Sequence, residues 1–139
     1  TKGARLVAGG RHEGAWLDAT ILDGVTPNMR IYYEETFGPV ACVIRYADID
    51  EAVSIANDTE YGLAAAVFGR DVGRALDVAR RLETGICHIN GTTIYDEPQM
   101  PFGGVRASGW GRFGGRAGID EFTELRWITI QSGKQEYPI

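Results

Sequence analysis

Residues 40–90 decide the fold class of this chain: VACVIRYADIDEAVSIANDTEYGLAAAVFGRDVGRALDVARRLETGICHIN. Three mostly apolar runs in this stretch have the length and composition of β-strands. They are Val40–Tyr46, Leu63–Phe68 and Gly85–Asn90. A segment with helical spacing separates each run from the next. The order strand, helix, strand, helix, strand predicts two βαβ crossovers and a parallel sheet in an α/β domain. The first run is typical of a strand that is buried on both faces.

Two aspartates mark the starts of the intervening helices. Asp48 is followed three residues later by Glu51, which is the signature of a capping box. The apolar stripe of this first helix consists of Ile49, Ala52, Val53 and Ala56. Asp71 precedes a second stripe, which consists of Val72, Ala75, Leu76, Ala79 and Leu82. We expect this second helix to be stopped at Gly85, where a left-handed residue is wanted.

Shorter elements are expected on either side of this unit. Gly3–Ala8 and Trp16–Leu22 have strand composition, and a turn-prone segment separates them. A short helix is expected near Gly118–Glu124. Leu125–Gln131 then alternates as a final strand with apolar side chains on both faces. Such a strand invites pairing with another chain, and the alternative is an edge strand of the chain's own sheet.

The composition narrows the class of protein. The 139 residues are 44% hydrophobic and 24% charged, a balance typical of a soluble folded domain. The net charge is −5 and no basic stripe is visible, which argues against a nucleic-acid partner. No apolar run approaches the roughly 20 residues that cross a bilayer, so no membrane association is expected. Two cysteines in a chain of this size indicate a reducing, cytoplasmic setting.

Two long motifs carry the most functional information. The sequence QMPFGGVRASG occupies residues 99–109, and EETFGPV occupies residues 34–40. In this order they resemble the closing half of an NAD(P)-dependent aldehyde dehydrogenase, and the resemblance covers essentially the whole chain. It implies that residues 1–114 form the C-terminal half of the catalytic (substrate) domain. Residues 115–139 would then supply a C-terminal helix, an oligomerisation strand and a tail.

The resemblance also implies an activity for a longer protein. Its nucleophilic Cys and general-base Glu are expected upstream of Thr1, so no catalytic residue is expected in this chain. Within the family the chain looks closest to bacterial aromatic-aldehyde members, the salicylaldehyde, benzaldehyde and vanillin dehydrogenases. The residues that carry this likeness are 89–93, 96–97, 111–115 and 122–129. The intact protein would oxidise an aldehyde to its acid with NAD or NADP.

Partners follow from the same resemblance. A small-molecule aldehyde would be the substrate, and Leu125–Gln131 would join subunits into a homodimer or homotetramer. Two other classes stay open at this point. The chain could be a non-catalytic module that only binds nucleotide, or an assembly element that docks on a full-length partner.

The acidic pair at residues 34–35 is the candidate cofactor clamp. A carboxylate can accept hydrogen bonds from both hydroxyls of a ribose, and its charge strengthens them. By resemblance Glu35 binds the ribose on the nicotinamide side, and Phe37 packs beside the nicotinamide ring. The alternative is a solvated acidic turn.

Three residues are candidates for the substrate pocket. Phe102 resembles the aromatic residue that family members place in the substrate tunnel, where a ring excludes water and stacks on flat substrates. Ile94 and Tyr95 would line the tunnel mouth. The alternative for Phe102 is a core position under a glycine loop.

Several other features are interpreted as structural. Residues 109–114 match the dinucleotide pattern G-x-G-x-x-G, but no strand is expected before them, so we interpret them as a glycine turn. Cys42 and Cys87 lie inside predicted strands without an obvious base, which indicates inert packing. His12 and His88 are too few and too far apart for a metal site.

Overall fold

The computed structural model describes residues 2–134, which form a mixed α/β chain with three small sheets. The strands are β1 (Arg5–Ala8), β2 (His12–Glu13), β3 (Trp16–Leu17), β4 (Thr20–Asp23), β5 (Val40–Val43), β6 (Ala64–Val67) and β7 (Ile86–Ile89). The helices are α1 (Arg30–Tyr33), α2 (Ile49–Asn57), α3 (Val72–Ala79) and α4 (Gly115–Glu121), with a 3-10 turn at Arg106–Ser108. None of the helices in residues 2–134 has the length and apolar character needed to cross a membrane.

The first sheet has the strand order β1-β4-β5. β1 runs antiparallel to β4, and β4 runs parallel to β5. A separate hairpin pairs β2 with β3. The predicted strand Trp16–Leu22 is therefore two strands, because the chain turns at residues 18–19 from the hairpin into the sheet.

The second half of the chain contains one βαβ unit. β6 and β7 are parallel, and α3 connects them and packs against both. Asp71 caps α3 by accepting a hydrogen bond from the backbone N–H of Arg74 (3.0 Å). Asp48 caps α2 in the same way with the N–H of Glu51 (2.9 Å), so both predicted helix starts are confirmed.

The expectation of one sheet with two crossovers is wrong. β5 pairs with β4, and among the described residues β6 pairs with β7 alone, so the two strands belong to different sheets. The chain leaves the first sheet after Val43 and passes through residues 44–48 into α2. β5 is also not buried on both faces: Val40 is half-buried and the other three residues are exposed. No other strand in residues 2–134 pairs with its outer edge.

Gly85 does not end α3 as predicted. The helix stops at Ala79, six positions earlier, and Gly85 is required for a different reason. A Cβ at Gly85 would overlap the backbone carbonyl of Gly103. The glycine therefore permits a close approach between the start of β7 and the loop that follows the strand.

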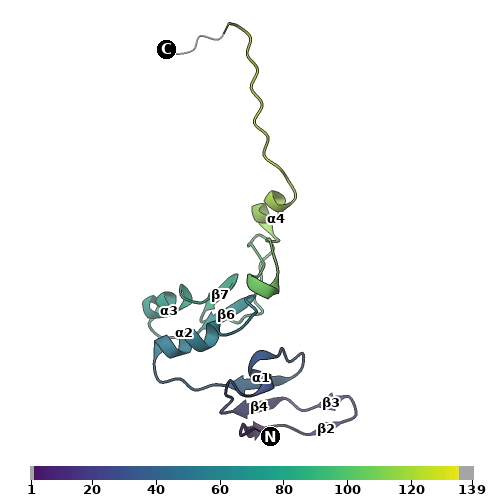
Figure 1. The fold of residues 1–139 in the computed structure, drawn as a ribbon, viewed down its shortest axis with the longest axis vertical. Helices are drawn as coiled ribbons and strands as arrows, with labels where there is room; N and C mark the ends of the chain where they lie inside the picture. The colour runs from purple at the N-terminus through teal and green to yellow at the C-terminus, as the bar shows by residue number, and fades with distance from the viewer. Residues whose placement is uncertain (1, 135–139) are drawn as a thin grey trace.

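The C-terminal part differs from the prediction in two ways. The predicted helix near Gly118–Glu124 begins earlier, since α4 spans Gly115–Glu121. Leu125–Gln131 is not a strand here, because the described residues offer it no hydrogen-bonded neighbour. It runs away from α4 as a single drawn-out trace (Figure 1), and its large apolar side chains are exposed.

A buried carboxylate ties the first sheet together. Asp23 is only 6% exposed and ends β4. Its Oδ2 accepts hydrogen bonds from Arg5 of β1 (2.7 Å) and from Arg45, just after β5 (2.8 Å). The hydrogen bonds from Arg45 and then Arg5 lower the pKa of Asp23 from 3.8 to about 2.

Replacing Asp23 with Asn should make the stability of the chain less dependent on acid pH. Because the pKa is lowered on folding, the ionised carboxylate stabilises the fold fully above about pH 4, and this stabilisation is lost as the pH falls towards 2. Urea unfolding should therefore show a destabilised Asp23→Asn variant at neutral pH and a difference that shrinks towards pH 2. Asp77→Asn, which removes an ion pair exposed on both sides, is the control. A difference that is independent of pH would contradict this account.

Candidate substrate and cofactor site

A cavity of about 330 Å³ lies between β7 and the loop that follows it. The strand side of its wall includes Cys87 and His88, and the loop side includes Tyr95, Glu97 and Phe102. The volume falls within the range of small-molecule sites, roughly 300–1,000 Å³. Aromatic rings on one side with a few polar groups opposite can bind a small, flat, partly polar molecule.

Phe102 is held in this wall by its backbone. Its N–H donates to the carbonyl of Phe113 (2.9 Å), and the N–H of Phe113 donates back to the carbonyl of Phe102 (2.7 Å). This isolated antiparallel bridge fixes the loop from Met100 onwards. The alternative of a core Phe is not what the structure shows, since Phe102 is 36% exposed and faces the cavity.

Tyr95 lies edge-to-face against His88, with ring centroids 5.9 Å apart and planes at 88°. Its hydroxyl donates to the carboxylate of Glu97, and this hydrogen bond raises the pKa of Tyr95. The phenol therefore stays protonated and fixed in direction. Ile94 is 90% exposed and does not line the cavity, so the structure does not bring it together with Tyr95 and Phe102.

Cys87 and His88 line the cavity, although both are expected from the sequence to be structural. Both residues belong to β7. The apolar run around them does not indicate that one face of the strand borders a cavity. Burial raises the pKa of the Cys87 thiol, which keeps it protonated and a poor nucleophile at neutral pH. The Nε2 atom of His88 is buried and has no hydrogen-bond partner among the described residues.

Cys42 is exposed, which corrects its assignment to inert packing inside a buried strand. The reason is that, among residues 2–134, β5 has a hydrogen-bonded neighbour on one edge only. Partial desolvation nevertheless raises the pKa of its thiol. Neither cysteine therefore has the electropositive environment that activates a thiolate.

The acidic pair splits into two different roles. Both guanidinium nitrogens Nε and Nη2 of Arg30 donate to the Glu34 carboxylate at 2.7 Å, which lowers the pKa of Glu34. Within residues 2–134, the side chain of Glu35 takes part in no hydrogen bond or ion pair. Phe37 is 97% exposed. Glu35 and Phe37 thus leave a charged acceptor and a ring face available on the same exposed segment.

Residues 109–114 form a turn that supports the cavity loop. A 3-10 turn, not a strand, precedes Gly109, so a dinucleotide fingerprint is absent from this part of the described chain. Gly114 has φ +85°, and a Cβ there would lie 2.9 Å from the carbonyl of Pro98. The glycine therefore allows the turn to lie against the loop that carries Phe102.

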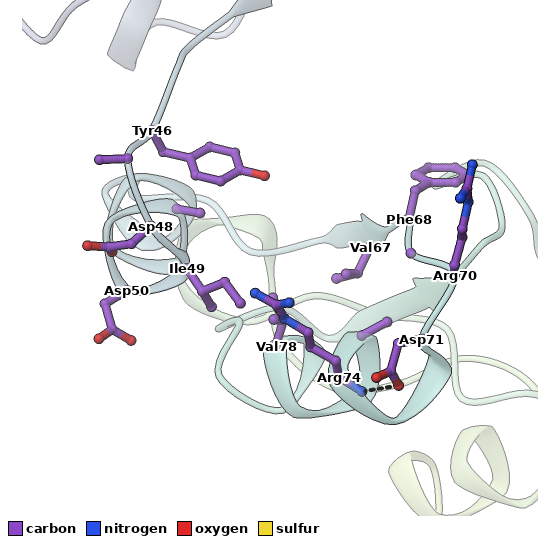
Figure 2. A pocket seen from close by; sticks show the side chains of 14 residues that line it. Tyr46, Asp48, Ile49, Asp50, Val67, Phe68, Arg70, Asp71, Arg74 and Val78 are labelled. Atoms are coloured by element: carbon purple, nitrogen blue, oxygen red, sulfur yellow. Dashed lines mark hydrogen bonds between the residues drawn. The ribbon is translucent and has the colours of Figure 1, made fainter.

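A second, larger cleft of about 900 Å³ lies between α2, β6 and α3. Figure 2 shows Tyr46 pointing from the residues before α2 into this space, with Arg74 and the capping residue Asp71 on the α3 side. Its lining mixes apolar and charged side chains. None of the residues predicted for cofactor or substrate binding lines this cleft.

The chain is similar to known proteins over nearly its whole length. The family model described as Aldehyde dehydrogenase family matches residues 1–128. A vanillin dehydrogenase of Pseudomonas fluorescens is 59% identical over 138 residues, which is 99% of this chain and 29% of that protein. The chain therefore spans less than a third of the length of such relatives.

Two solved structures are similar over nearly the whole chain. A salicylaldehyde dehydrogenase from Pseudomonas putida G7, complexed with salicylaldehyde, has a TM-score of 0.91 and 56% identity over 99% of this chain and 28% of its own. A Mycobacterium tuberculosis aldehyde dehydrogenase complexed with NAD+ has a TM-score of 0.86 and 37% identity over 97% of this chain and 29% of its own. With the family match over residues 1–128, these findings show that the chain belongs to the aldehyde dehydrogenase family.

Proposed function

We propose that this chain is the C-terminal part of a longer, cytoplasmic NAD(P)-dependent dehydrogenase that oxidises an aromatic aldehyde to its carboxylic acid. The observation that carries the proposal is the cavity between β7 and its following loop, with Tyr95 and Phe102 in its wall. Aromatic side chains at a site favour flat, aromatic ligands because rings stack and pack edge-to-face. The names of the similar vanillin and salicylaldehyde dehydrogenases support the same substrate class.

The exposed apolar surface supports the view that the chain is part of a larger protein. Among the described hydrophobic residues only Val25, Met29, Val53 and Ala75 are buried. Contiguous exposed apolar surface on a folded chain usually marks a contact with other protein. Residues 1–114 would complete a catalytic domain whose other half lies upstream, and residues 115–139 would form the helix, strand and tail used in assembly.

Glu35 and Phe37 are the proposed cofactor contacts. The unpaired, exposed carboxylate of Glu35 fits the two hydroxyls of a ribose, whereas Glu34 is engaged by Arg30. The exposed ring of Phe37 can pack on a flat heterocycle. NAD(P)+, when bound, supplies the acceptor for the hydride that leaves the aldehyde carbon. The part of this chain is to orient the cofactor and to enclose the aldehyde.

The nucleophilic Cys and the general-base Glu are proposed to lie before Thr1. Within the cavity, Phe102 and Tyr95 would hold the ring of the aldehyde and exclude water around it. Ile94, on the exposed part of the same loop, would reach the substrate only at the tunnel mouth. A second candidate function is an assembly module without catalysis, which the unpaired apolar residues 125–130 favour.

The chain alone should not oxidise aldehydes. Burial raises the pKa of Cys87, and no described group activates either thiol, so a thiolate nucleophile is lacking. The measurement is NADH formation from NAD+ with benzaldehyde or salicylaldehyde, beside Cys87→Ser and Cys42→Ser variants. Turnover that disappears in Cys87→Ser and persists in Cys42→Ser would show that Cys87 is a nucleophile.

In the full-length enzyme, Glu35→Gln should impair use of the cofactor. The change removes the charge from two hydrogen bonds, each worth roughly 1.5–3 kcal/mol when charge-assisted, and leaves neutral bonds in place. We expect kcat/KM for NAD(P)+ to fall about ten- to a hundredfold. Glu34→Gln is the matched control, because it loses only an exposed ion pair with Arg30. Equal kinetics for the two variants would remove Glu35 from the cofactor site.

Leu125–Gln131 is proposed to pair with a sheet of a neighbouring subunit in a homodimer or homotetramer. Its apolar side chains are exposed and no described strand of this chain pairs with it. Backbone pairing across subunits would satisfy its N–H and C=O groups.

Deleting residues 125–139 from the full-length enzyme should therefore yield monomers or aggregates by light scattering. Deleting residues 133–139 alone, which leaves the proposed strand intact, should preserve the oligomer. If the longer deletion keeps the native oligomer size, the segment belongs to its own subunit.

A further inference from the structure

We propose that Arg106 is a positioning residue for the substrate cavity: its guanidinium fixes the loop after β7 to the end of α2 and to the chain after α3, and thereby keeps Phe102 in the cavity wall. The proposal rests on the proposed function of that cavity. Arg106 itself does not line the cavity, so its effect on the substrate would be transmitted through the loop.

The backbone of Arg106 adopts a conformation that side chains rarely take. Its φ is +56°, in the left-handed region, and Asn90 is the only other non-glycine residue among those described with a positive φ. Such a conformation is strained and persists only where surrounding contacts hold it. Contacts of the Arg106 side chain can supply this restraint.

The guanidinium of Arg106 binds three acceptors on two other segments. Nη1 donates to the carbonyls of Asn57 (2.8 Å) and Thr59 (2.7 Å), and Nη2 pairs with the carboxylate of Glu83. Asn57 is the last residue of α2, where carbonyls lack helical partners and the helix dipole favours a cation. One planar group thus satisfies the end of a helix and a charged side chain together.

Asn57 locks the same two segments to each other. Its side-chain Nδ2 donates to the carbonyl of Arg81 (2.9 Å), and its Oδ1 accepts from the N–H of Glu83 (2.9 Å). The Glu83 carboxylate is thereby placed where Arg106 can reach it. The anchor for the loop is consequently a rigid one, made of a helix end and the chain after α3.

Backbone hydrogen bonds continue the attachment on either side of Arg106. The N–H of Val105 donates to the carbonyl of Gly62 (2.9 Å), and that of Ala107 donates to the carbonyl of Glu60 (3.0 Å). Only Gly103 and Gly104 lie between this attachment and Phe102, and the carbonyl of Gly104 accepts a hydrogen bond from Nη1 of Arg112 (2.7 Å). Three restraints therefore act on the position of Phe102: its bridge to Phe113, the hydrogen bond from Arg112 to Gly104, and the Arg106 attachment.

The test uses the full-length enzyme and the ratio of kcat/KM for benzaldehyde to that for acetaldehyde. Arg106→Gly removes the side chain and tolerates the left-handed backbone, so it should fold. We expect the ratio to fall about ten- to a hundredfold, the scale on which small misplacements at a site act. Arg106→Lys, which keeps the charge without the planar fork, should retain more of the ratio. Arg80→Ala, which loses only an exposed ion pair with Asp77, should retain all of it.

Two further measurements separate positioning from a general loss of structure. In a Phe102→Ala background, Arg106→Gly should cause no additional fall in the ratio, because the ring it positions is gone. Hydrogen exchange at the amides of Val105 and Ala107 should accelerate in Arg106→Gly, while the amide of Val67 in β6 should not. An equal loss with both aldehydes, a further fall in the Phe102→Ala background, or unchanged exchange would each overturn the proposal.

The exchange measurement does not depend on catalysis. If the enzyme oxidises neither aldehyde, the proposed function fails. Faster exchange at Val105 and Ala107 in Arg106→Gly would then still support the attachment of the loop, and unchanged exchange would refute it.

Discussion

The candidate cavity depends on a contact between backbones that leaves no room for side chains. The carbonyl of Gly62, just before β6, accepts hydrogen bonds from the N–H groups of Gly85 (3.0 Å) and Val105 (2.9 Å). A Cβ at Gly62 would lie 2.7 Å from the carbonyl of Glu83, and one at Gly85 would overlap the Gly103 carbonyl. Only glycine allows the returning loop to lie directly on the strand starts. This close approach is what brings the ring of Phe102 opposite the face of β7.

The same loop explains how a small chain with few buried residues can form a cavity. A two-stranded sheet such as β6–β7 is marginal on its own, and α3 packs against it. The loop adds hydrogen bonds from Val105 and Arg106 to segments that precede β6 and β7. These hydrogen bonds therefore both stabilise the β6–β7 unit and set the form of the cavity. The exposed strand β5 lacks such support, and within the described part of the chain it pairs with β4 alone.

Signals that act over a few residues could be predicted from the sequence, whereas long-range pairing could not. Asp48 and Asp71 were identified as caps because a capping hydrogen bond spans three residues. The partner of β5 depends on which strand edge the folded chain brings next to it. The apolar pattern of residues 40–46 does not specify that edge. Tyr95 and Phe102 were grouped by family resemblance, and they do share a cavity. The place of Cys87 beside a cavity could not be predicted, because an apolar strand face next to a cavity has the same pattern as one in a core.

Under the proposed function, the residues that line the cavity would contact the ring substituents of an aromatic aldehyde. The vanillin and salicylaldehyde dehydrogenases are 59% and 56% identical to this chain, yet their names refer to differently substituted rings. Overall sequence identity to this chain therefore does not distinguish relatives that are named for different aldehydes. Phe102 would offer a ring face to a flat aldehyde, and Tyr95 and Glu97 place a directed hydroxyl and a carboxylate in the same cavity. Recognition of a ring substituent requires such directed polar groups, because a hydroxyl left without a partner in an apolar site is costly. Under the proposed function, the polar side of the loop at residues 95–97 would therefore be the part of this chain that distinguishes substituted benzaldehydes.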